Sequence, residues 1–439
     1  MKVRFGTDSA TLKSGQNAPV VWDSTRVING HMLIMGKSGT GKTYTLKKIL
    51  DQMQEQSQKG VRVHIMDVHG DIEVPGACTV KFSESTQYGF NPLMINPDPD
   101  FGGVRKKIQS FLAALNRTQM KLGSKQEAVL RNILIDLYAA NGFYEGQPKS
   151  WLLNDGVTRK FPKKYPTLGD AAKFANYKLK SMFLGTSSKA VGALESVNRK
   201  VSQFYVKQKN LHKSFSDLDK KADEDDIKKT IEEAQELYNN YLNSIQTGME
   251  LTDLIKYDSK EVMKSVVERL ENLNAIGIFK PEAPPFDPRC NIWRYDIRAL
   301  SVDEKKLFVS FMLEAIFLLC VQRGVQDDIR EIIVLDEAHN FFNDEPDNIT
   351  NVISKEARKF GAAMICASQS PTHFSDDFVA NVGTKIILGL DQMFWDGSVR
   401  KLKLDLAALE WIVPHYKMVI QINNKAELKN RFVWTMLDR

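Results

Sequence analysis

The segment Gly-Lys-Ser-Gly-Thr-Gly-Lys-Thr at residues 36–43 constrains the fold of this chain more than any other feature. It matches the pattern G-x-x-x-x-G-K-[S/T] at every fixed position. The apolar run at residues 31–35 precedes it directly, and such runs are typical of strands buried on both faces of a parallel sheet. After it, apolar residues recur at helical spacing, namely Leu46, Ile49, Leu50 and Met53. The sequence therefore predicts a strand, a glycine-rich loop and a helix, in that order.

Each residue type in this loop suits the binding of phosphate groups. The glycines let the backbone curl so that its N–H groups point into a phosphate-sized nest, and the helix that follows adds its positive N-terminal end. We expect Lys42 to reach the β- and γ-phosphates and the Thr43 hydroxyl to ligate Mg²⁺. The predicted nucleotide-binding residues are Gly36, Lys37, Ser38, Gly39, Thr40, Gly41, Lys42, Thr43 and Tyr44. A chance glycine-rich turn would lack the strand and the helix on either side.

Two carboxylates follow a second apolar run, at residues 332–335. In phosphate-loop enzymes the first carboxylate, here Asp336, supports Mg²⁺, and a second, here Glu337, can activate the attacking water as a general base. Acids at a strand end are common by themselves, but together with the loop they predict a nucleotide hydrolase. The Asp-Glu pair favours an ATPase over a kinase or a slow GTPase. ATP is the expected nucleotide because no Asn-Lys-x-Asp guanine-reading motif is present.

Gln369 follows the next predicted strand, at residues 362–367. The carboxyl ends of parallel strands meet at one edge of a sheet, so this places Gln369 beside the phosphate loop. A side-chain amide there can touch both the γ-phosphate and the catalytic water. We expect Gln369 to sense the γ-phosphate, the alternative being an ordinary polar loop residue.

The composition excludes several classes of protein. With 439 residues, 43% of them apolar and 26% charged, the chain is neither disordered nor fibrous. A net charge of +6 permits a polyanionic partner without requiring one. Four dispersed cysteines without a CxxC pair argue against a zinc site or a disulfide framework. The start of the chain lacks the apolar run of a signal peptide, and the longest apolar stretch, residues 307–321, is too short for a bilayer. A cytoplasmic protein is expected.

The pattern of elements predicts an α/β fold with a mostly parallel sheet and a helical insertion. We expect a short β-rich lead-in at residues 1–30, a first part of the ATPase core at 31–149, the insertion at 150–288, and the rest of the core at 289–439. Within the insertion a heptad stripe predicts an antiparallel helical hairpin; it consists of Ile227, Ile231, Ala234, Tyr238, Tyr241 and Ile245.

These motifs together resemble the HerA/FtsK superfamily of P-loop ATPases, which includes HerA-type DNA translocases and the ATPases of conjugation and type IV secretion. The motifs that carry the resemblance occur in the expected order: residues 36–43, Asp67-Val-His-Gly-Asp71, Gly89-Phe-Asn-Pro-Leu93, Asp336-Glu-Ala-His339, Arg358-Lys-Phe-Gly361 and Ala367-Ser-Gln369. The second and third narrow the resemblance to this branch, since the first and fourth are shared by many ATPases.

The resemblance implies a RecA-like fold that assembles as a ring, commonly a hexamer, with ATP between subunits and DNA in the pore. It also implies that an arginine from the neighbouring subunit completes the site; Arg358 matches that arginine, with Lys359 as the second candidate. The alternative is that Arg358 only solvates a helix end. The chain departs from the HerA pattern because residues 1–30 leave no room for a β-barrel, and because Asp71 stands where Glu is frequent. The cargo, duplex DNA, single-stranded DNA or protein, stays open.

Three functions remain in competition. The first is a ring-forming, helicase-like DNA translocase that works with a nuclease or another effector in DNA end processing or antiviral (phage) defence. The second is a conjugation or secretion ATPase that energises a membrane channel, and the third is a nucleotide-gated scaffold. Any DNA contact is expected to be to the phosphate backbone, through basic clusters at 105–107 and 400–403, because no base-reading motif is present. No metal other than nucleotide-bound Mg²⁺ is predicted.

Overall fold

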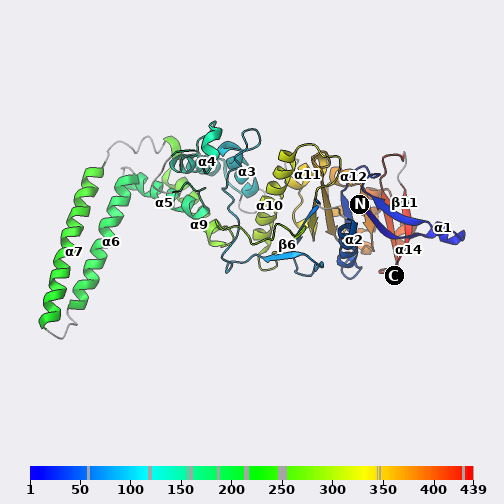
Figure 1. Cartoon of the computed structure of the whole chain (residues 1–439), viewed down its shortest axis with the longest axis horizontal. Helices are drawn as coiled ribbons and strands as arrows, with labels where there is room; N and C mark the ends of the chain where they lie inside the picture. The colour runs from blue at the N-terminus through cyan, green and yellow to red at the C-terminus, as the bar shows by residue number, and fades with distance from the viewer. Residues whose placement is uncertain are drawn as a thin grey trace. The chain divides into compact units, whose positions relative to one another are not determined.

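The computed structural model describes residues 1–56, 60–116, 121–154, 156–157, 162–184, 188–211, 217–245, 255–343, 345, 348–427 and 431–438. The chain divides into two compact units (Figure 1). The sheet unit comprises Met1–Phe90, Ala114–Met120 and Lys280–Arg439. The helical unit comprises Asn91–Ala113 and Lys121–Phe279.

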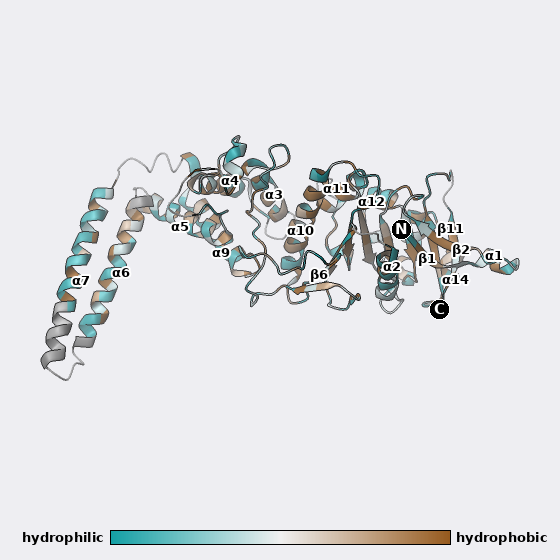
Figure 2. Ribbon diagram, viewed as in Figure 1, coloured by the Kyte–Doolittle hydropathy of each residue, from teal (hydrophilic) through white to brown (hydrophobic). Residues whose placement is uncertain are grey.

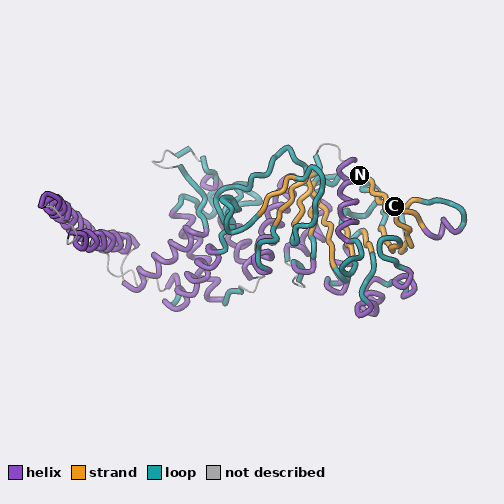
Figure 3. The backbone as a smooth tube through the Cα atoms, turned by 90° about the horizontal axis from the view of Figure 1, so that it is seen from below, coloured by secondary structure: helices purple, strands orange, loops and turns teal. Residues whose placement is uncertain are grey.

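One eleven-stranded sheet runs through the sheet unit, in the order β2-β1-β11-β10-β9-β3-β8-β7-β4-β6-β5. Strands of this unit lie side by side in Figure 3. The seven strands from β9 to β5 are parallel to one another, and the remaining pairings are antiparallel. The strands are β1 (Lys2–Asp8), β2 (Pro19–Asp23), β3 (Met32–Met35), β4 (Arg62–Asp67), β5 (Cys78–Lys81), β6 (Ile292–Asp296), β7 (Glu331–Leu335), β8 (Ala362–Ser368), β9 (Thr384–Ile387), β10 (Lys417–Ile422) and β11 (Phe432–Leu437). The predicted α/β class with a mostly parallel sheet is confirmed.

The centre of this sheet is apolar on both faces because helices cover it. Every residue of β3, β7 and β8 is buried, as expected for parallel strands. Helix α2 (Lys42–Gln56) packs on the sheet through its apolar stripe, in which Leu46, Ile49, Leu50 and Met53 belong to the core. The predicted strand, loop and helix around residues 36–43 are therefore present. Helix α10 (Val302–Arg323), which contains the longest apolar stretch of the sequence, buries eight of its side chains, and a capping box at Ser301 and Glu304 sets its start.

A hairpin of two strands, β1 and β2, begins the chain. β1 and β2 pair antiparallel, the five-residue helix α1 (Ser9–Lys13) lies between them, and β1 also pairs with β11. The strand pattern of the sequence missed β5 and β11. In β5 only Val80 is buried, so the strand lacks the apolar run that reveals the central strands.

Shorter elements connect the strands of the sheet unit. They are η2 (Ala338–Asn340), α11 (Ile349–Glu356), η3 (Ala357–Phe360), η4 (Pro371–His373), α12 (Asp376–Asn381), η5 (Gln392–Phe394), α13 (Trp395–Leu402) and α14 (Leu406–Trp411).

The helical unit begins earlier than the composition suggested, at Asn91 rather than near residue 150. Its elements are most of α3 (Val104–Asn116), α4 (Ser124–Ala140), η1 (Pro148–Trp151), α5 (Leu168–Leu184), α6 (Ser188–Leu211), α7 (Asp217–Ser244) and α9 (Lys260–Ala275). Helix α4 packs on α5 and α9, and the Gln126 amide donates to Ser265 Oγ at 2.7 Å. The composition of the sequence changes near residue 150, where charge density rises. The unit boundary lies earlier, where the chain stops packing on the sheet and begins to pack on other helices.

Helices α6 and α7 form the predicted hairpin. Lys200 of α6 pairs with Glu233 of α7, and Lys207 pairs with Asp226. Residue numbers rise along α6 while those of the partners fall along α7, so the two helices run antiparallel. Hydrophilic residues cover most of both helices in Figure 2. Within the described residues, no helix is both long enough and apolar enough to cross a membrane.

The buried His31 predicts how stability depends on pH. His31 precedes β3 and is 1% exposed; its Nδ1 accepts the Met364 N–H at 3.0 Å, and its Nε2 has no partner among the described residues. Burial lowers its pKa to about 4. The unfolded chain takes up a proton near its ordinary value of 6.5 while the folded chain does not, so stability falls as pH drops through this window.

We expect the His31→Asn variant to lose less stability than the wild type between pH 7 and pH 5. At 1.36 kcal/mol per pKa unit, the stability lost over this interval should differ between the two proteins by about 2 kcal/mol. The asparagine Oδ1 takes the position of Nδ1 and can still accept the Met364 N–H, so the fold should survive. Urea unfolding of both proteins at the two pH values measures the effect, and equal losses of stability would contradict it.

Candidate active site

The backbone of residues 36–43 has a shape that only glycine allows at three positions. Gly39 and Gly41 have positive φ angles of 79° and 94°. A Cβ on Gly36 would lie 2.3 Å from Thr40 Oγ1. The glycines that match the phosphate-loop pattern are therefore required by the local geometry.

Hydrogen bonds within the protein hold the loop in this shape. The Gly36 N–H donates to Ser368 O at 3.1 Å, and the Lys37 N–H donates to Gly389 O at 2.8 Å. His415 Nε2 lies 2.9 Å from Gly39 O, to which it can donate. Lys42 Nζ donates to Gly36 O at 2.8 Å, so the ammonium group lies across the loop. The loop is thus preorganised for an anion, with its lysine in place.

The strand register brings the other predicted residues to the same edge of the sheet. Met35 of β3 pairs with Ser368 of β8, so Gln369 follows directly beside the start of the loop. Leu335 of β7 pairs with Cys366, which places Asp336 and Glu337 next along that edge. The structure therefore brings together residues 36–44, Asp336, Glu337 and Gln369.

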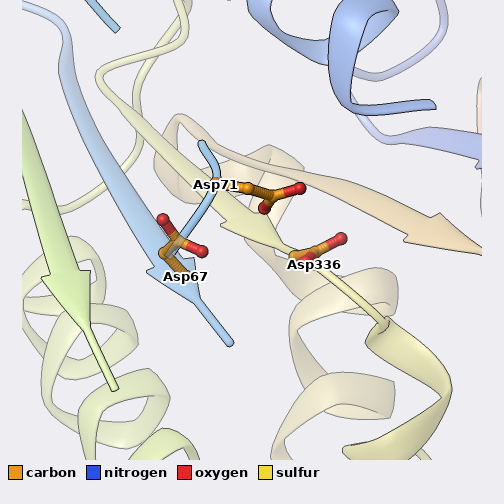
Figure 4. Close-up of side chains that lie close together, drawn as sticks. All are labelled: Asp67, Asp71 and Asp336. Carbon is orange, nitrogen blue, oxygen red and sulfur yellow. The ribbon is translucent and has the colours of Figure 1, made fainter. Parts of the chain in front are cut away.

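Three carboxylates from the ends of β4 and β7 meet at this edge (Figure 4). One oxygen each from Asp67, Asp71 and Asp336 lies within 4.8 Å of the others. Thr43 Oγ1 is 3.5 Å from Asp71 Oδ2. Burial, and then the nearby charges of Glu337 and Asp71, raise the pKa of Asp336 to about 6. Clustered oxygen ligands that repel one another suit Mg²⁺, which takes oxygen donors and removes the repulsion.

Asp67 differs from the other two because its oxygens are already bonded. It is fully buried, and its Oδ2 accepts from Arg294 Nε and lies 2.7 Å from Arg294 Nη2. Its carboxylate also accepts the N–H groups of Gly70 at 2.7 Å and Ile72 at 3.1 Å. Asp67 therefore shapes the loop that presents Asp71, and the metal-binding role is left to Asp71 and Asp336.

Glu337 occupies a strained and partly desolvated position. Its φ of 45° lies in the left-handed region, which costs a non-glycine residue about 1–3 kcal/mol and is found mostly at functional sites. Its Oε2 is buried and makes no hydrogen bond within the described residues. His339 Nδ1 is 3.4 Å away, a contact that pairs charges only if the imidazole is protonated. Burial, and then Lys42, lower the pKa of His339, whereas Glu337 raises it; the net direction is down, which favours the neutral ring.

Known proteins resemble this chain in sequence and in fold. Residues 9–98, which contain the phosphate loop and the Asp67–Asp71 segment, match the family described as "Helicase HerA, central domain". The structure of VirB4 of Thermoanaerobacter pseudethanolicus aligns with a TM-score of 0.61 at 15% identity, over 100% of this chain and 96% of that one. The bacterial conjugative coupling protein TrwBΔN70 aligns with a TM-score of 0.53 at 11% identity, over 99% and 93%. Residues 9–98 thus match the HerA family model, and the chain shares the fold of the VirB4 and TrwB structures.

Two further comparisons concern a part of the chain or its fold. TrwB in complex with ADP and Mg²⁺ aligns with a TM-score of 0.51 at 10% identity, over 100% of this chain and 94% of that one. The uncharacterized protein aq_aa31 of Aquifex aeolicus (strain VF5) is 41% identical over 49 residues. That alignment spans 11% of this chain and 18% of the relative.

Arg358 lies away from the edge that carries the phosphate loop. It is exposed in η3, just before β8 begins, whereas the loop adjoins the end of β8. Seven residues of strand separate the two edges by roughly 20 Å. Arg358 is therefore not assembled with the phosphate loop of its own chain, and neither is its exposed neighbour Lys359.

The basic clusters already make contacts within the protein: Lys106 Nζ donates to Asp100 O, and Arg400 Nε donates to Asp396 O at 3.3 Å. Arg105 and Lys106 are exposed on α3, and Arg400 and Lys403 are exposed at the end of α13. Lys401 lies 2.9 Å from Asp376 and is engaged in an ion pair.

Two contributors to the site were not among the predicted site residues. Asp71 appeared only as part of a motif, although it follows a strand end as Asp336 does, and the same reasoning would have identified it. His415 lies more than 370 positions from the loop it touches, and no local pattern marks it.

Proposed function

We propose that this protein hydrolyses Mg²⁺-ATP as a ring-forming motor that moves along DNA. The observation that carries the proposal is the meeting of Thr43, Asp71, Asp336 and Glu337 beside a preorganised phosphate loop. The residues fit a nucleotide-bound Mg²⁺: the Thr43 hydroxyl and the carboxylates of Asp336 and Asp71 would hold it. Such an ion would neutralise charge that develops on the phosphates.

The loop, Lys42, Glu337 and Gln369 each have a separate role in hydrolysis. The backbone N–H groups of the loop and the start of α2 bind the phosphates, and Lys42 turns from Gly36 O to the β- and γ-phosphates. Glu337, whose buried Oε2 makes no hydrogen bond within the described residues, accepts the proton of the attacking water. Gln369 orients that water against the γ-phosphate.

A ring explains the position of Arg358. An exposed arginine at the far edge of the sheet can reach the nucleotide of a neighbouring copy, where it stabilises the charge of the transition state. A hexamer is the expected ring, with DNA backbone contacts from the clusters around Arg105 and Arg400. We further propose that the motor works with a nuclease or another effector in DNA end processing or phage defence.

A second candidate is a conjugation or secretion ATPase. The alignments with VirB4 and a conjugative coupling protein over nearly the whole chain support it. A nucleotide-gated scaffold is the third.

ATP turnover without DNA, with duplex DNA and with single strands tests the proposal, with Glu337→Gln as the blank. Stimulation by one form of DNA, lost in the blank, is expected and identifies the track. A turnover rate that does not change when DNA is added would contradict the proposal of a DNA motor. Co-purification with a membrane complex would then support the secretion ATPase.

The Asp71→Asn variant should need more Mg²⁺ than the wild type. The substitution keeps the shape of the side chain but removes a charge that faces the metal, and the loss of such a supporting partner weakens metal binding about 10- to 100-fold. Turnover measured across a Mg²⁺ titration reports the shift. Asp396→Asn, an exposed change on α13, is the matched control. Identical Mg²⁺ curves for Asp71→Asn and the wild type would exclude a role of Asp71 in metal binding.

A further inference from the structure

Two cysteines that are far apart in the sequence meet at one end of the sheet. Cys78 begins β5, which is the last strand in the order of the sheet. Cys290 lies two residues before β6, in the segment that follows the helical unit. β5 and β6 pair in parallel, with Cys78 opposite Trp293. This register places Cys78 beside the residues that lead into β6.

Asp287 connects the two cysteines through its backbone. Its N–H donates to Cys78 Sγ at 3.4 Å, and its carbonyl oxygen accepts the Cys290 N–H at 3.0 Å. The Cys78 thiol also lies close enough to the Cys290 thiol to affect its ionisation: burial, and then Asp287 and Cys78, raise the pKa of Cys290. The two thiols are therefore neighbours in the folded chain, although no pattern in the sequence pairs them.

Small solutes can reach both thiols. Cys78 and Cys290 are each partly exposed, whereas the other two cysteines, Cys320 and Cys366, are buried. Among the described residues, no histidine, carboxylate or further cysteine joins the pair to complete a metal-binding group. Two accessible thiols without further ligands suit a disulfide better than a soft metal ion, which takes about four ligands.

We propose that Cys78 and Cys290 form a reversible disulfide by exchange with a small-molecule disulfide such as oxidised glutathione. The Cys78 thiolate attacks one sulfur of that molecule, and one glutathione leaves as its thiolate. The Cys290 thiolate then attacks Cys78 Sγ in the mixed disulfide, and the second glutathione leaves. Two protein thiols are thus oxidised to one S–S bond, the glutathione disulfide is reduced to two thiols, and the two protons pass to the departing thiolates.

The order of the two steps follows from the environment of Cys290. Its raised pKa leaves a small fraction of thiolate, which slows attack on a molecule in solution. The second step tolerates this small fraction because it takes place within one chain, where the mixed disulfide on Cys78 is already adjacent.

The disulfide would fasten the segments that flank the helical unit, since that unit lies wholly between the two cysteines in the sequence. These segments are already hydrogen bonded. The Gly89 N–H donates to Glu282 O at 3.0 Å, and Lys280 Nζ donates to Glu84 O at 2.9 Å. A covalent link would keep the segments together when these bonds break. It would also close a long loop and so lower the entropy of the unfolded chain.

Incubation of the full chain with oxidised glutathione tests the proposal. After alkylation in denaturant, the wild type should have lost two of its four thiols, and a digest should contain peptides joined through Cys78 and Cys290. Dithiothreitol should restore both thiols. Cys290→Ser should instead retain a glutathione adduct on Cys78, and Cys78→Ser should form no link. Cys320→Ala, which removes a buried thiol, is the control and should still form the link.

Urea unfolding measures the consequence for the fold. The oxidised wild type should unfold at a higher urea concentration than the reduced protein, and Cys290→Ser should show no such shift. Four intact thiols after incubation, glutathione adducts on both cysteines without a link, or links between two chains would each overturn the proposed disulfide. Equal urea midpoints for the oxidised and reduced wild type would overturn its role in fastening the flanking segments. None of these measurements depends on nucleotide hydrolysis.

Discussion

Glu337→Gln is expected to bind ATP as the wild type does and to lower its turnover by about 10²- to 10⁴-fold, the usual contribution of a general base. The amide keeps the size of the side chain but cannot accept the proton of the attacking water. Its backbone is strained, and its Oε2 makes no hydrogen bond in the part of the chain that the structure describes, so the local fold does not require this carboxylate for its own stability.

Nucleotide binding and steady-state turnover, measured on the same protein, separate chemistry from affinity. Glu356→Gln, an exposed change at the end of α11, is the matched control. If Glu337→Gln hydrolyses ATP at the wild-type rate, another group activates the water. If it fails to bind ATP, the residue supports the loop instead.

Arg358→Ala is expected to reduce turnover about 10³-fold or more, because an arginine supplied by a neighbour contributes 10³ to 10⁵ in related phosphoryl transfers. Its position, roughly 20 Å of strand from its own loop, leaves action on another copy as the route to the nucleotide. The side chain is exposed, so its removal should not affect folding.

A mixing experiment distinguishes action between copies from action within one. Arg358→Ala and Glu337→Gln proteins are each expected to be nearly inactive. Mixed rings should recover activity, since some interfaces pair an intact Glu337 with an intact Arg358. Lys359→Ala is the control and should keep activity. Mixtures that stay inactive, or a loss confined to Lys359→Ala, would reject Arg358 as the residue acting between subunits.

The central strands could be predicted because burial on both faces leaves a continuous apolar run. β3, β7 and β8 have such runs and were expected within two residues of their observed bounds. β5 has a single buried residue, so the apolar pattern of the sequence did not predict it. The boundary of the helical unit was misplaced for a related reason: α4 has the apolar stripe of any packed helix, and the stripe does not reveal whether a sheet or other helices cover it.

The sequence by itself determined the phosphate loop, the acidic strand end and their membership of one sheet edge. These are local features: the glycine spacing sets the loop, and parallel strands bring their ends together. Only the tertiary structure showed that Asp67 is bonded to Arg294, whereas Asp71 faces Thr43. It also showed that His415 contacts the loop. Those roles depend on distances between segments far apart in the chain, which no local pattern encodes.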